Sequence, residues 1–280
     1  MDCPDSVYRI VDPRFPQAEI GTWFGRSIIL GKAHFGQNPQ PAMGEVSSLG
    51  KRASGKSNGD DAKNNMKLKH GIYNIYKPPG PTSHDMVDQV RKLSGEQRVG
   101  HAGTLDPFAE GILIVAIGRE YTKKLGQFLK QDKVYKATIK LGAESDTGDL
   151  TGNIIEARPQ LGHGKREVER ILKSFIGEIE QVPPAFSAIK IKGRKAYELA
   201  RKGIMPDLKP RRVKIYSLKV LKYRWPYLEI ETRVSSGTYI RSLARDIGQA
   251  LKTGGYLEKL VRTKIGRFDI KKSIKLLGLD

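Results

Sequence analysis

One short stretch of the sequence combines a carboxylate with several glycines, and it is the first candidate for chemistry. It spans Arg98–Gly111, reads RVGHAGTLDPFAEG and holds Asp106 near its centre. Gly lets the backbone approach a ligand closely, and functional side chains are often carried by loops that a rigid scaffold positions. The alternative is structural, because an aspartate followed by Pro107 can simply close a tight turn. Spacing alone favours the turn.

The segments that flank this stretch determine where its carboxylate can lie. Directly after it, Gly111–Ile117 reads GILIVAI, a continuous apolar run that predicts a buried strand. Before it, Gly71–Tyr76 predicts a strand that ends at the Lys77–Pro81 turn. Thr82 or Ser83 can cap a helix that runs to Leu93. The carboxylate is therefore expected on a loop at the mouth of a strand.

Further elements follow along the chain. Lys133–Leu141 alternates between two sets of side chains and predicts a strand with two distinct faces. Paired strands mixed with helices indicate an α+β fold rather than a βαβ repeat. The remaining predictions are helices at Tyr121–Phe128, Val168–Ile176 and Thr238–Leu251, and strands at Val213–Tyr223 and Tyr227–Val234 around a turn at Trp225-Pro226.

The overall charge narrows the class of partner. The chain has 280 residues with 50 Lys+Arg against 30 Asp+Glu, a formal net charge of +20. Such an excess attracts polyanions, and nucleic acid is the first candidate; a merely solvated basic surface is the alternative. Two basic runs are expected to contact phosphates, namely Lys190, Lys192, Arg194 and Lys195, and Lys209, Arg211 and Arg212.

The first 65 residues differ from the rest. Residues 36–65 are rich in Gly, Ser, Asn, Pro and Lys and cannot bury enough apolar surface to offset the entropy of ordering. We expect residues 1–65 to be an extension that is flexible or outside the working protein, and residues 66–280 to be the catalytic domain.

Cysteine usage and hydropathy indicate the compartment. Cys3 is the one cysteine, so no disulfide framework and no cysteine-based zinc site can form within the chain. No apolar run approaches the roughly 18 residues that span a bilayer, and no signal-peptide pattern opens the sequence. A reducing, cytoplasmic setting is expected.

The Asp106 stretch and several other segments together resemble the TruB family of tRNA pseudouridine synthases. GHAGTLDPFAEG is similar to the family's catalytic motif, and further motifs follow the family's order between about His70 and Phe268. An ordered set of this length is highly specific. The other matching segments are YKPPGPTS (Tyr76–Ser83), KVYKATIKLGAESDTGDLTG (Lys133–Gly152), VPPAFSAIK (Val182–Lys190), GRKAY (Gly193–Tyr197), SSGTYIRSLARDIG (Ser235–Gly248) and LVRTKIGRF (Leu260–Phe268).

The resemblance implies three catalytic residues: Asp106, Tyr135 and Arg241. Pseudouridine formation breaks the N1–C1′ bond, rotates the base and joins C5 to C1′, so it needs a nucleophile or base and no redox centre. Asp106 must be ionised to act in this way. Arg241 would be its counter-charge or a phosphate clamp. Tyr135 would stack on a flipped uracil, unless it is core like its neighbours on the strand face.

The resemblance also implies a set of substrate-binding residues. His101 would fill the gap left by the flipped base, with loop packing as the alternative, and Leu260 would form an apolar wall of the pocket. Asp149 would orient Arg241. Lys77 would steady the loop or touch RNA. The full expected set is Lys77, His101, Gly103, Thr104, Asp149 and Leu260.

Two alternative chemistries are weighed against this one. Asp146 and Asp149 are close enough to suggest a metal, but the family is metal-independent, so neither a metal nor a cofactor is expected. A glycoside hydrolase would need a second carboxylate near Asp106; Glu110 is near in sequence but stands at a variable position of the motif, and that interpretation is set aside.

The implied protein is a pseudouridine synthase of mixed, mostly antiparallel sheet flanked by helices, with a cleft across the sheet. Its expected substrate is uridine 55 in the TΨC arm of tRNA. Many members carry a small RNA-binding domain after the closing segment, whereas only Asp269–Asp280 follow it here, so we expect a catalytic core that acts alone as a monomer. The alternatives are a non-catalytic RNA-binding or tRNA-folding protein on the same core, or a synthase for another RNA; the joint presence of Asp106, Tyr135 and Arg241 favours the enzyme.

Overall fold

The protein is built on one large sheet. The computed structural model describes residues 68–156, 162–187, 189–191 and 193–276, so the expectation for residues 1–65 lies outside the described part. The strands are β1 (Gly71–Lys77), β2 (Val99–Ala102), β3 (Glu110–Ile117), β4 (Lys133–Leu141), β5 (Ala143–Ser145), β6 (Ile154–Glu156), β7 (Gly177–Gln181), β8 (Lys190–Ile191), β9 (Arg194–Lys195), β10 (Arg211–Arg224), β11 (Tyr227–Val234), β12 (Gly255–Ile265), β13 (Phe268–Asp269) and β14 (Ile274–Lys275).

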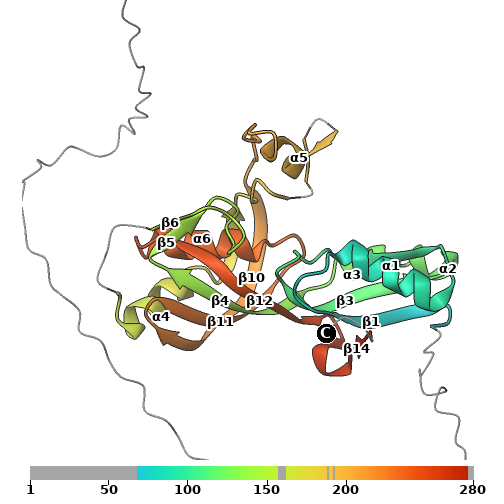
Figure 1. Cartoon of the computed structure of the whole chain (residues 1–280). Helices are drawn as coiled ribbons and strands as arrows, with labels where there is room; N and C mark the ends of the chain where they lie inside the picture. Colours follow the sequence, from blue (N-terminus) through green and yellow to red (C-terminus); the bar gives the residue numbers. More distant parts are fainter. Residues whose placement is uncertain (1–67, 157–161, 188, 192, 277–280) are drawn as a thin grey trace, which may run out of the picture. The chain divides into compact units, whose positions relative to one another are not determined.

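Helices cover this sheet in two groups, and α5 lies apart from both (Figure 1). They are α1 (Ser83–Ser94), α2 (Arg119–Thr122), α3 (Gly126–Leu129), α4 (Lys165–Lys173), α5 (Ala196–Ala200) and α6 (Ile240–Ala250), with a 3₁₀ turn at Ile270–Lys272. Helices α1 and α2 lie near β2 and β3, and α3 lies near β2, while α4 lies near β10 and α6 near β12 and β4 (Figure 1).

The strand order is β14–β1–β3–β12–β4–β11–β10–β7, with β2 beside β3 and β13 beside β12. The pairs β1–β14 and β3–β12 are parallel, and the other pairs of this sheet are antiparallel. The sheet in the described part is therefore mixed and mostly antiparallel, as predicted.

Strand β3 is apolar throughout because both of its faces are covered. Leu113, Val115 and Ile117 pack in a cluster with Met86 and Val90 of α1. The alternate residues, Ile112 and Ile114, pack on the other side with Phe128 and Ile265. A strand that is buried on both faces needs no polar alternation, and the prediction from GILIVAI is confirmed.

Strand β4 shows the opposite pattern. Tyr135, Ala137, Ile139 and Leu141 are buried in the largest core cluster, together with side chains from α4 and α6, while the residues between them are more exposed. The predicted two-faced strand is confirmed. It pairs with β11 on one side and with β12 on the other.

The two groups of elements meet at a narrow junction. Strand β12 pairs with β4 along nearly its whole length but with β3 only at Val261↔Glu110 and Arg262↔Gly111. At Gly111 the φ angle is +115°, and an added Cβ would lie 2.3 Å from the Arg262 carbonyl oxygen. Only glycine allows the two backbones to approach this closely.

Several predicted boundaries need correction. The helix expected at 121–128 is two single turns, α2 and α3. The helix expected at 168–176 begins earlier, at Lys165, and ends at Lys173, because residues 174–176 tighten into i→i+3 turns. Helix α6 begins at Ile240, two residues after the predicted start.

Nine strands of the described part were not predicted: β2, β5, β6, β7, β8, β9, β12, β13 and β14. Strand β12 was noticed only as a motif, since its register shifts between Leu257 and Lys259 and again between Arg262 and Lys264. Each bulge breaks the period of two that identifies a strand in a sequence.

Gly111→Ala is expected to destabilise the protein by about 2–5 kcal/mol, through overpacking against Arg262 and a strained φ angle. The measurement is the urea midpoint. Gly126→Ala is the matched control, because nothing lies within 4 Å of its added Cβ; it should stay within about 1 kcal/mol of the parent. Equal midpoints for the two variants would contradict the close approach.

Candidate active site

Asp106 lies on the loop between β2 and β3, which we call the Asp106 loop (Gly103–Ala109). The loop starts at Gly103 with φ +79°. The Asp106 side chain is 35% exposed, whereas Leu105 and Ala109 on the same loop are buried. The carboxylate can therefore be reached from outside while its backbone is fixed in the core.

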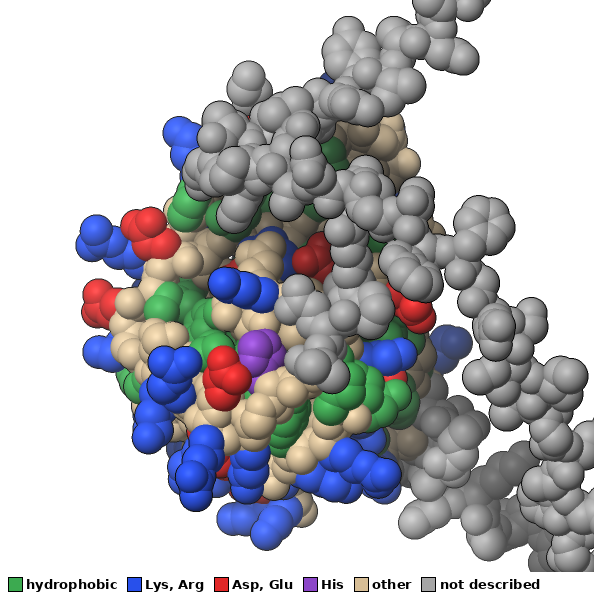
Figure 2. Space-filling view, turned by 90° about the vertical axis from the view of Figure 1, so that its left-hand side faces the viewer, with side chains coloured by type: hydrophobic (Ala, Val, Ile, Leu, Met, Phe, Trp, Pro, Cys, Tyr) green, Lys and Arg blue, Asp and Glu red, His purple; other side chains and the backbone are tan. Residues whose placement is uncertain are grey.

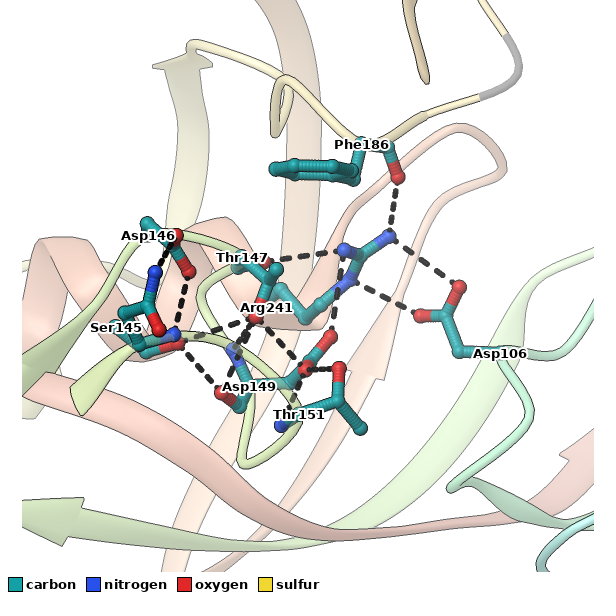
Figure 3. Close-up of polar contacts among 9 residues, drawn as sticks. Asp106, Ser145, Asp146, Thr147, Asp149, Thr151, Phe186 and Arg241 are labelled. Atoms are coloured by element: carbon teal, nitrogen blue, oxygen red, sulfur yellow. Dashed lines mark hydrogen bonds and ion pairs between the residues drawn. The ribbon is translucent and has the colours of Figure 1, made fainter. Parts of the chain in front are cut away.

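Arg241, on the first turn of α6, faces Asp106 from across the sheet junction (Figure 3). Its Nε lies 3.0 Å from Asp106 Oδ2, and its Nη2 lies 3.3 Å from Oδ1. The other acceptors around the guanidinium are the carbonyl oxygens of Thr147 at 3.1 Å and Phe186 at 2.9 Å, and Asp149 Oδ2 at 3.4 Å. Five acceptor atoms thus lie within 3.4 Å of the guanidinium nitrogens, and three of them accept hydrogen bonds. This geometry fits a counter-charge better than a phosphate clamp, because the guanidinium is already bound by two carboxylates and two carbonyls of the protein.

Asp149 holds this guanidinium from the loop between β5 and β6. Asp149 is 3% exposed. Its Oδ1 accepts hydrogen bonds from the Thr147 hydroxyl and from both the hydroxyl and the backbone N–H of Thr151. Its Oδ2 faces Arg241 (Figure 3). The geometry agrees with the expected orienting role.

The electrostatics of Asp106 combine two opposing effects. Burial raises the pKa of Asp106 above the usual aspartate value, and the Arg241 guanidinium works against this rise. Asp149 adds to the rise and Lys77 opposes it. Asp106 is thus a carboxylate that is poorly solvated and held by one main cation, an arrangement typical of reactive groups.

Lys77 is fully buried beneath the Asp106 loop. Its ammonium donates to the carbonyl oxygens of Pro78 (2.8 Å), Pro107 (3.0 Å) and Ala109 (2.7 Å). Burial lowers the pKa of Lys77 to about 8. Of the two roles expected for Lys77, this geometry fits steadying the loop; contact with RNA would require the ammonium to leave three carbonyls.

Arg262 braces the same loop and was missed as a functional residue. It is 1% exposed, and its guanidinium donates to the carbonyl oxygens of Gly103 and Ile112, both at 2.8 Å. Lys133 is also buried and donates to the carbonyls of Leu129 and Gln131, and burial lowers the pKa of Lys133 to about 8. The sequence signal was available, since Arg262 lies inside LVRTKIGRF, but a charged residue in a strand looks like surface.

His101, Gly103 and Thr104 lie around the start of the Asp106 loop. The His101 ring is largely buried with Nδ1 unpaired among the described residues. Burial lowers the pKa of His101, and the nearby Arg262 charge lowers it further. Thr104 is exposed. The substrate-binding role expected for His101, Gly103 and Thr104 stays a prediction.

Tyr135 and Leu260 both lie in the core cluster next to Leu105. Leu260 pairs with Ala137 across the strands, so it is a diagonal neighbour of Tyr135 on the same face. Tyr135 is 7% and Leu260 is 5% exposed. The two side chains can form an apolar wall near Asp106, and the alternative of a purely packed Tyr135 fits the same burial.

Tyr239 is a second residue that the sequence reasoning passed over. Burial raises the pKa of Tyr239, and the charges of Arg211, Arg241 and Asp106 all act on it, so it lies near the Asp106–Arg241 pair. Its backbone is fixed by the buried Gln181 amide, which accepts from Tyr239 N (2.8 Å) and donates to Tyr239 O (3.1 Å). The sequence signal that could have identified Tyr239 was its position in the GTYIR motif.

Other predicted groups fall outside this centre. Glu110 accepts a hydrogen bond from Tyr76 and pairs with Lys259 at 3.4 Å. Asp146 accepts from the backbone N–H of Asn153. A surface cavity beside the loop is lined by Pro79, Phe108, Glu110, Thr138, Glu258 and Lys259, but not by Asp106. The cleft expected around Asp106 therefore stays a prediction.

The basic runs lie mostly on the surface. Arg194, Lys195, Lys209, Arg211 and Arg212 are exposed. Lys192 lies outside the described residues, and of Lys190 only the backbone is described. Further Lys and Arg side chains gather on the end of the sheet that carries α4 (Figure 2); Lys165, Arg166, Arg170 and Lys173 are exposed there.

Two features are absent from the described residues. No group of three or more His, Cys, Asp and Glu side chains is arranged there to hold a metal ion. None of the helices in that part of the chain is long and apolar enough to cross a membrane.

Comparison with known proteins gives a consistent result. The family described as "TruB family pseudouridylate synthase (N terminal domain)" matches residues 91–240. The tRNA pseudouridine synthase B of Trichormus variabilis is 45% identical over 213 residues, which cover 75% of this chain and 72% of that protein. The chain belongs to the TruB family of pseudouridine synthases. The protein of the same name from Caldanaerobacter subterraneus subsp. tengcongensis is 44% identical over 207 residues, or 74% of this chain and 72% of the relative.

Solved structures agree with the TruB fold. A chain of a Cbf5–Nop10–Gar1 complex has a TM-score of 0.59 and 31% identity over 74% of this chain. A chain of an H/ACA ribonucleoprotein bound to a substrate RNA containing 2′-deoxyuridine has a TM-score of 0.54 and 29% identity, also over 74%. This chain spans about half the length of those two chains, 52% and 51%. The family and the pseudouridine synthase fold expected from the motifs are both confirmed, and this TruB protein is an isomerase.

Asp149→Asn is expected to lower the unfolding free energy by about 2–4 kcal/mol, because an amide cannot both accept from the two threonines and face Arg241 without an unpaired buried donor. Urea denaturation at pH 7 measures this change.

Asp106→Asn is the matched control for Asp149→Asn and should keep or raise the midpoint. The folded-state pKa of Asp106 lies above its unfolded value, so its ionised form at pH 7 costs stability rather than adding it. The reverse order of the two midpoints would contradict this account of the pair.

Proposed function

We propose that this TruB protein converts uridine 55 in the TΨC arm of tRNA to pseudouridine, with Asp106 as the nucleophile. Three observations support the proposal: the curated relatives are named tRNA pseudouridine synthase B, the net charge is +20, and Asp106 is a reachable carboxylate paired with Arg241. The Asp106–Arg241 pair is the observation that carries the assignment of the nucleophile.

The reaction replaces one glycosidic bond by another. The N1–C1′ bond breaks, the base rotates, C5 joins C1′, the C5 proton leaves to water and N1 gains a proton. Asp106 can attack the ribose or the uracil ring, or trigger formation of a glycal, and in each case it must be ionised. Arg241 favours the ionised form by supplying the opposite charge at 3.0 Å.

The remaining residues are proposed to support this step. Tyr135 stacks on the flipped uracil, Leu260 forms the apolar wall, and His101 fills the space that the base leaves in the RNA. Asp149 orients Arg241, and Lys77 holds the Asp106 loop. Gly103 and Thr104 line the entry, while the exposed basic runs contact phosphates.

The proposal extends to the oligomeric state, the compartment, the absence of a metal and the domain bounds. The enzyme acts as a monomer in the cytoplasm without a metal, and residues 66–280 form its catalytic domain. Activity that is unchanged by a chelator and a monomeric mass in solution are the expected results. The intact mass of the protein purified from cells tests whether residues 1–65 are present.

Release of tritium from [5-³H]uridine-labelled tRNA transcript tests the chemistry. The parent protein should release tritium. Asp106→Asn should reduce release by at least about 10³-fold, while Asp88→Asn, an exposed aspartate paired with Arg91, should leave it unchanged. A transcript with cytidine in place of uridine 55 should release none.

Each other outcome has a definite meaning. Binding of tRNA without release would indicate a non-catalytic RNA-binding protein. Release that survives loss of uridine 55 would indicate a synthase for another site or another RNA. Full activity of Asp106→Asn would show that Asp106 is not the nucleophile.

The pH dependence tests the electrostatics of the pair. Because the ionised carboxylate is the active form and burial raises the pKa of Asp106, the rate should fall on the acid side at a pH above that of an ordinary aspartate. Arg241→Lys should shift this acid limb further upward and lower the single-turnover rate at least about tenfold, since lysine cannot contact both carboxylate oxygens. Arg233→Lys, which alters an exposed pair with Asp132, is the control and should change neither.

A further inference from the structure

Ser83 has an unusual set of hydrogen bonds next to the proposed nucleophile. Its hydroxyl donates to the carbonyl oxygen of Leu105 at 3.1 Å, and its Oγ accepts from the N–H of the same residue at 2.9 Å. Leu105 immediately precedes Asp106 in the chain. Ser83 is 2% exposed, so water does not compete for these bonds. One buried hydroxyl thus satisfies both backbone groups of one loop residue.

The helix that carries Ser83 does not need this hydroxyl for its own cap. Thr82 caps α1, because its Oγ1 accepts from the N–H of Asp85 and the Asp85 carboxylate accepts from the N–H of Thr82. A serine at a helix start usually serves such a cap. The hydroxyl of Ser83 is used between elements instead.

The anchor behind Ser83 is rigid. Met86, Val87 and Val90 of α1 are each at most 1% exposed and pack in the cluster that contains β3. On the other side of Asp106, the carbonyl of Pro107 accepts from Gly80 N at 2.9 Å and from Lys77 Nζ at 3.0 Å. The backbone is therefore held on both sides of Asp106, and the side-chain torsions are the main freedom that remains.

We propose that Ser83 is a positioning residue for the isomerisation: by holding Leu105, it places the Asp106 carboxylate against both Nε and Nη2 of Arg241. The proposal rests on Asp106 being the reacting carboxylate. Ser83 itself touches neither RNA nor the reacting atoms.

The loss of this clamp has a definite signature. Ser83→Ala leaves the N–H and the carbonyl oxygen of Leu105 buried without a partner. The backbone next to Asp106 then loses its anchor to α1. A displacement of about 1 Å at a reacting group can cost about 100-fold in rate. We expect kcat for tritium release to fall about 10- to 100-fold, with the KM for tRNA unchanged, because no RNA contact is removed.

The pH profile gives a second readout. The groups that act on Asp106 are Arg241 of α6, Asp149 of the β5–β6 loop and Lys77 of β1, with Tyr239 close by. A loosened contact with Arg241 weakens the largest of the effects that lower the pKa of Asp106. The acid limb of Ser83→Ala should therefore move to higher pH than in the parent.

Thr82→Ala is the matched control, since it damages the start of the same helix without touching the Asp106 loop. It should lower the thermal midpoint while leaving kcat and the acid limb as in the parent. Ser83→Thr keeps the hydroxyl and should recover kcat to within about threefold of the parent. If Ser83→Ala does not fold, Ser83→Cys, which keeps the shape but bonds weakly, should fold and show the same loss of kcat at constant KM.

The outcomes separate the two proposals. An inactive parent protein would refute the proposed function, and the role of Ser83 in the isomerisation would fall with it. An active parent with unchanged kcat and acid limb in Ser83→Ala, or in Ser83→Cys where alanine does not fold, would overturn the role of Ser83. Equal losses of kcat in Thr82→Ala and Ser83→Ala would also overturn it, because the effect would then belong to the helix start.

Discussion

The guanidinium of Arg241 is the interaction on which the site depends. Its five acceptors come from three separate segments, namely the Asp106 loop, the loop that carries Thr147 and Asp149, and the segment around Phe186. A planar group with donors in fixed directions sets the relative positions of all three. Because one guanidinium contacts all three segments, a change in any one of them alters the contacts of the others, and the Asp106 carboxylate is positioned by residues far from it in the chain.

The Asp106 loop obtains its rigidity from groups that normally belong on a surface. Lys77, Arg262 and the hydroxyl of Ser83 are all buried and bind backbone groups of residues 103–112. Buried cations are costly unless their donors are satisfied, and here backbone carbonyls satisfy them. Lys77 and Arg262 are thus bound by backbone carbonyls of the loop and its flanks, and the Asp106 carboxylate is left to pair with Arg241.

How much of the fold and of the site could be predicted depends on the sequence pattern that each segment carries. GILIVAI and the alternating Lys133–Leu141 run determine β3 and β4, because burial on two faces or on one face leaves a distinct pattern. Strand β12 was not predicted, because its two bulges and its charged Lys259, Arg262 and Lys264 disturb the alternation that identifies a strand. Asp106, Arg241 and Asp149 were brought together only by motif resemblance, since no local pattern links positions 106 and 241. Arg262 and Ser83 were missed because their roles depend on partners distant in sequence.

The two-residue ladder between β3 and β12 is reinforced by side chains on both sides of the junction. Leu105 and Ala109 of the Asp106 loop pack in the core cluster that contains α6, while Ser83 of α1 bonds both backbone groups of Leu105. Arg262 of β12 donates across the junction to the carbonyl oxygens of Gly103 and Ile112. The loop is thus tied to both groups of elements, so packing and hydrogen bonds fix the distance from Asp106 to Arg241 more than the short ladder itself does.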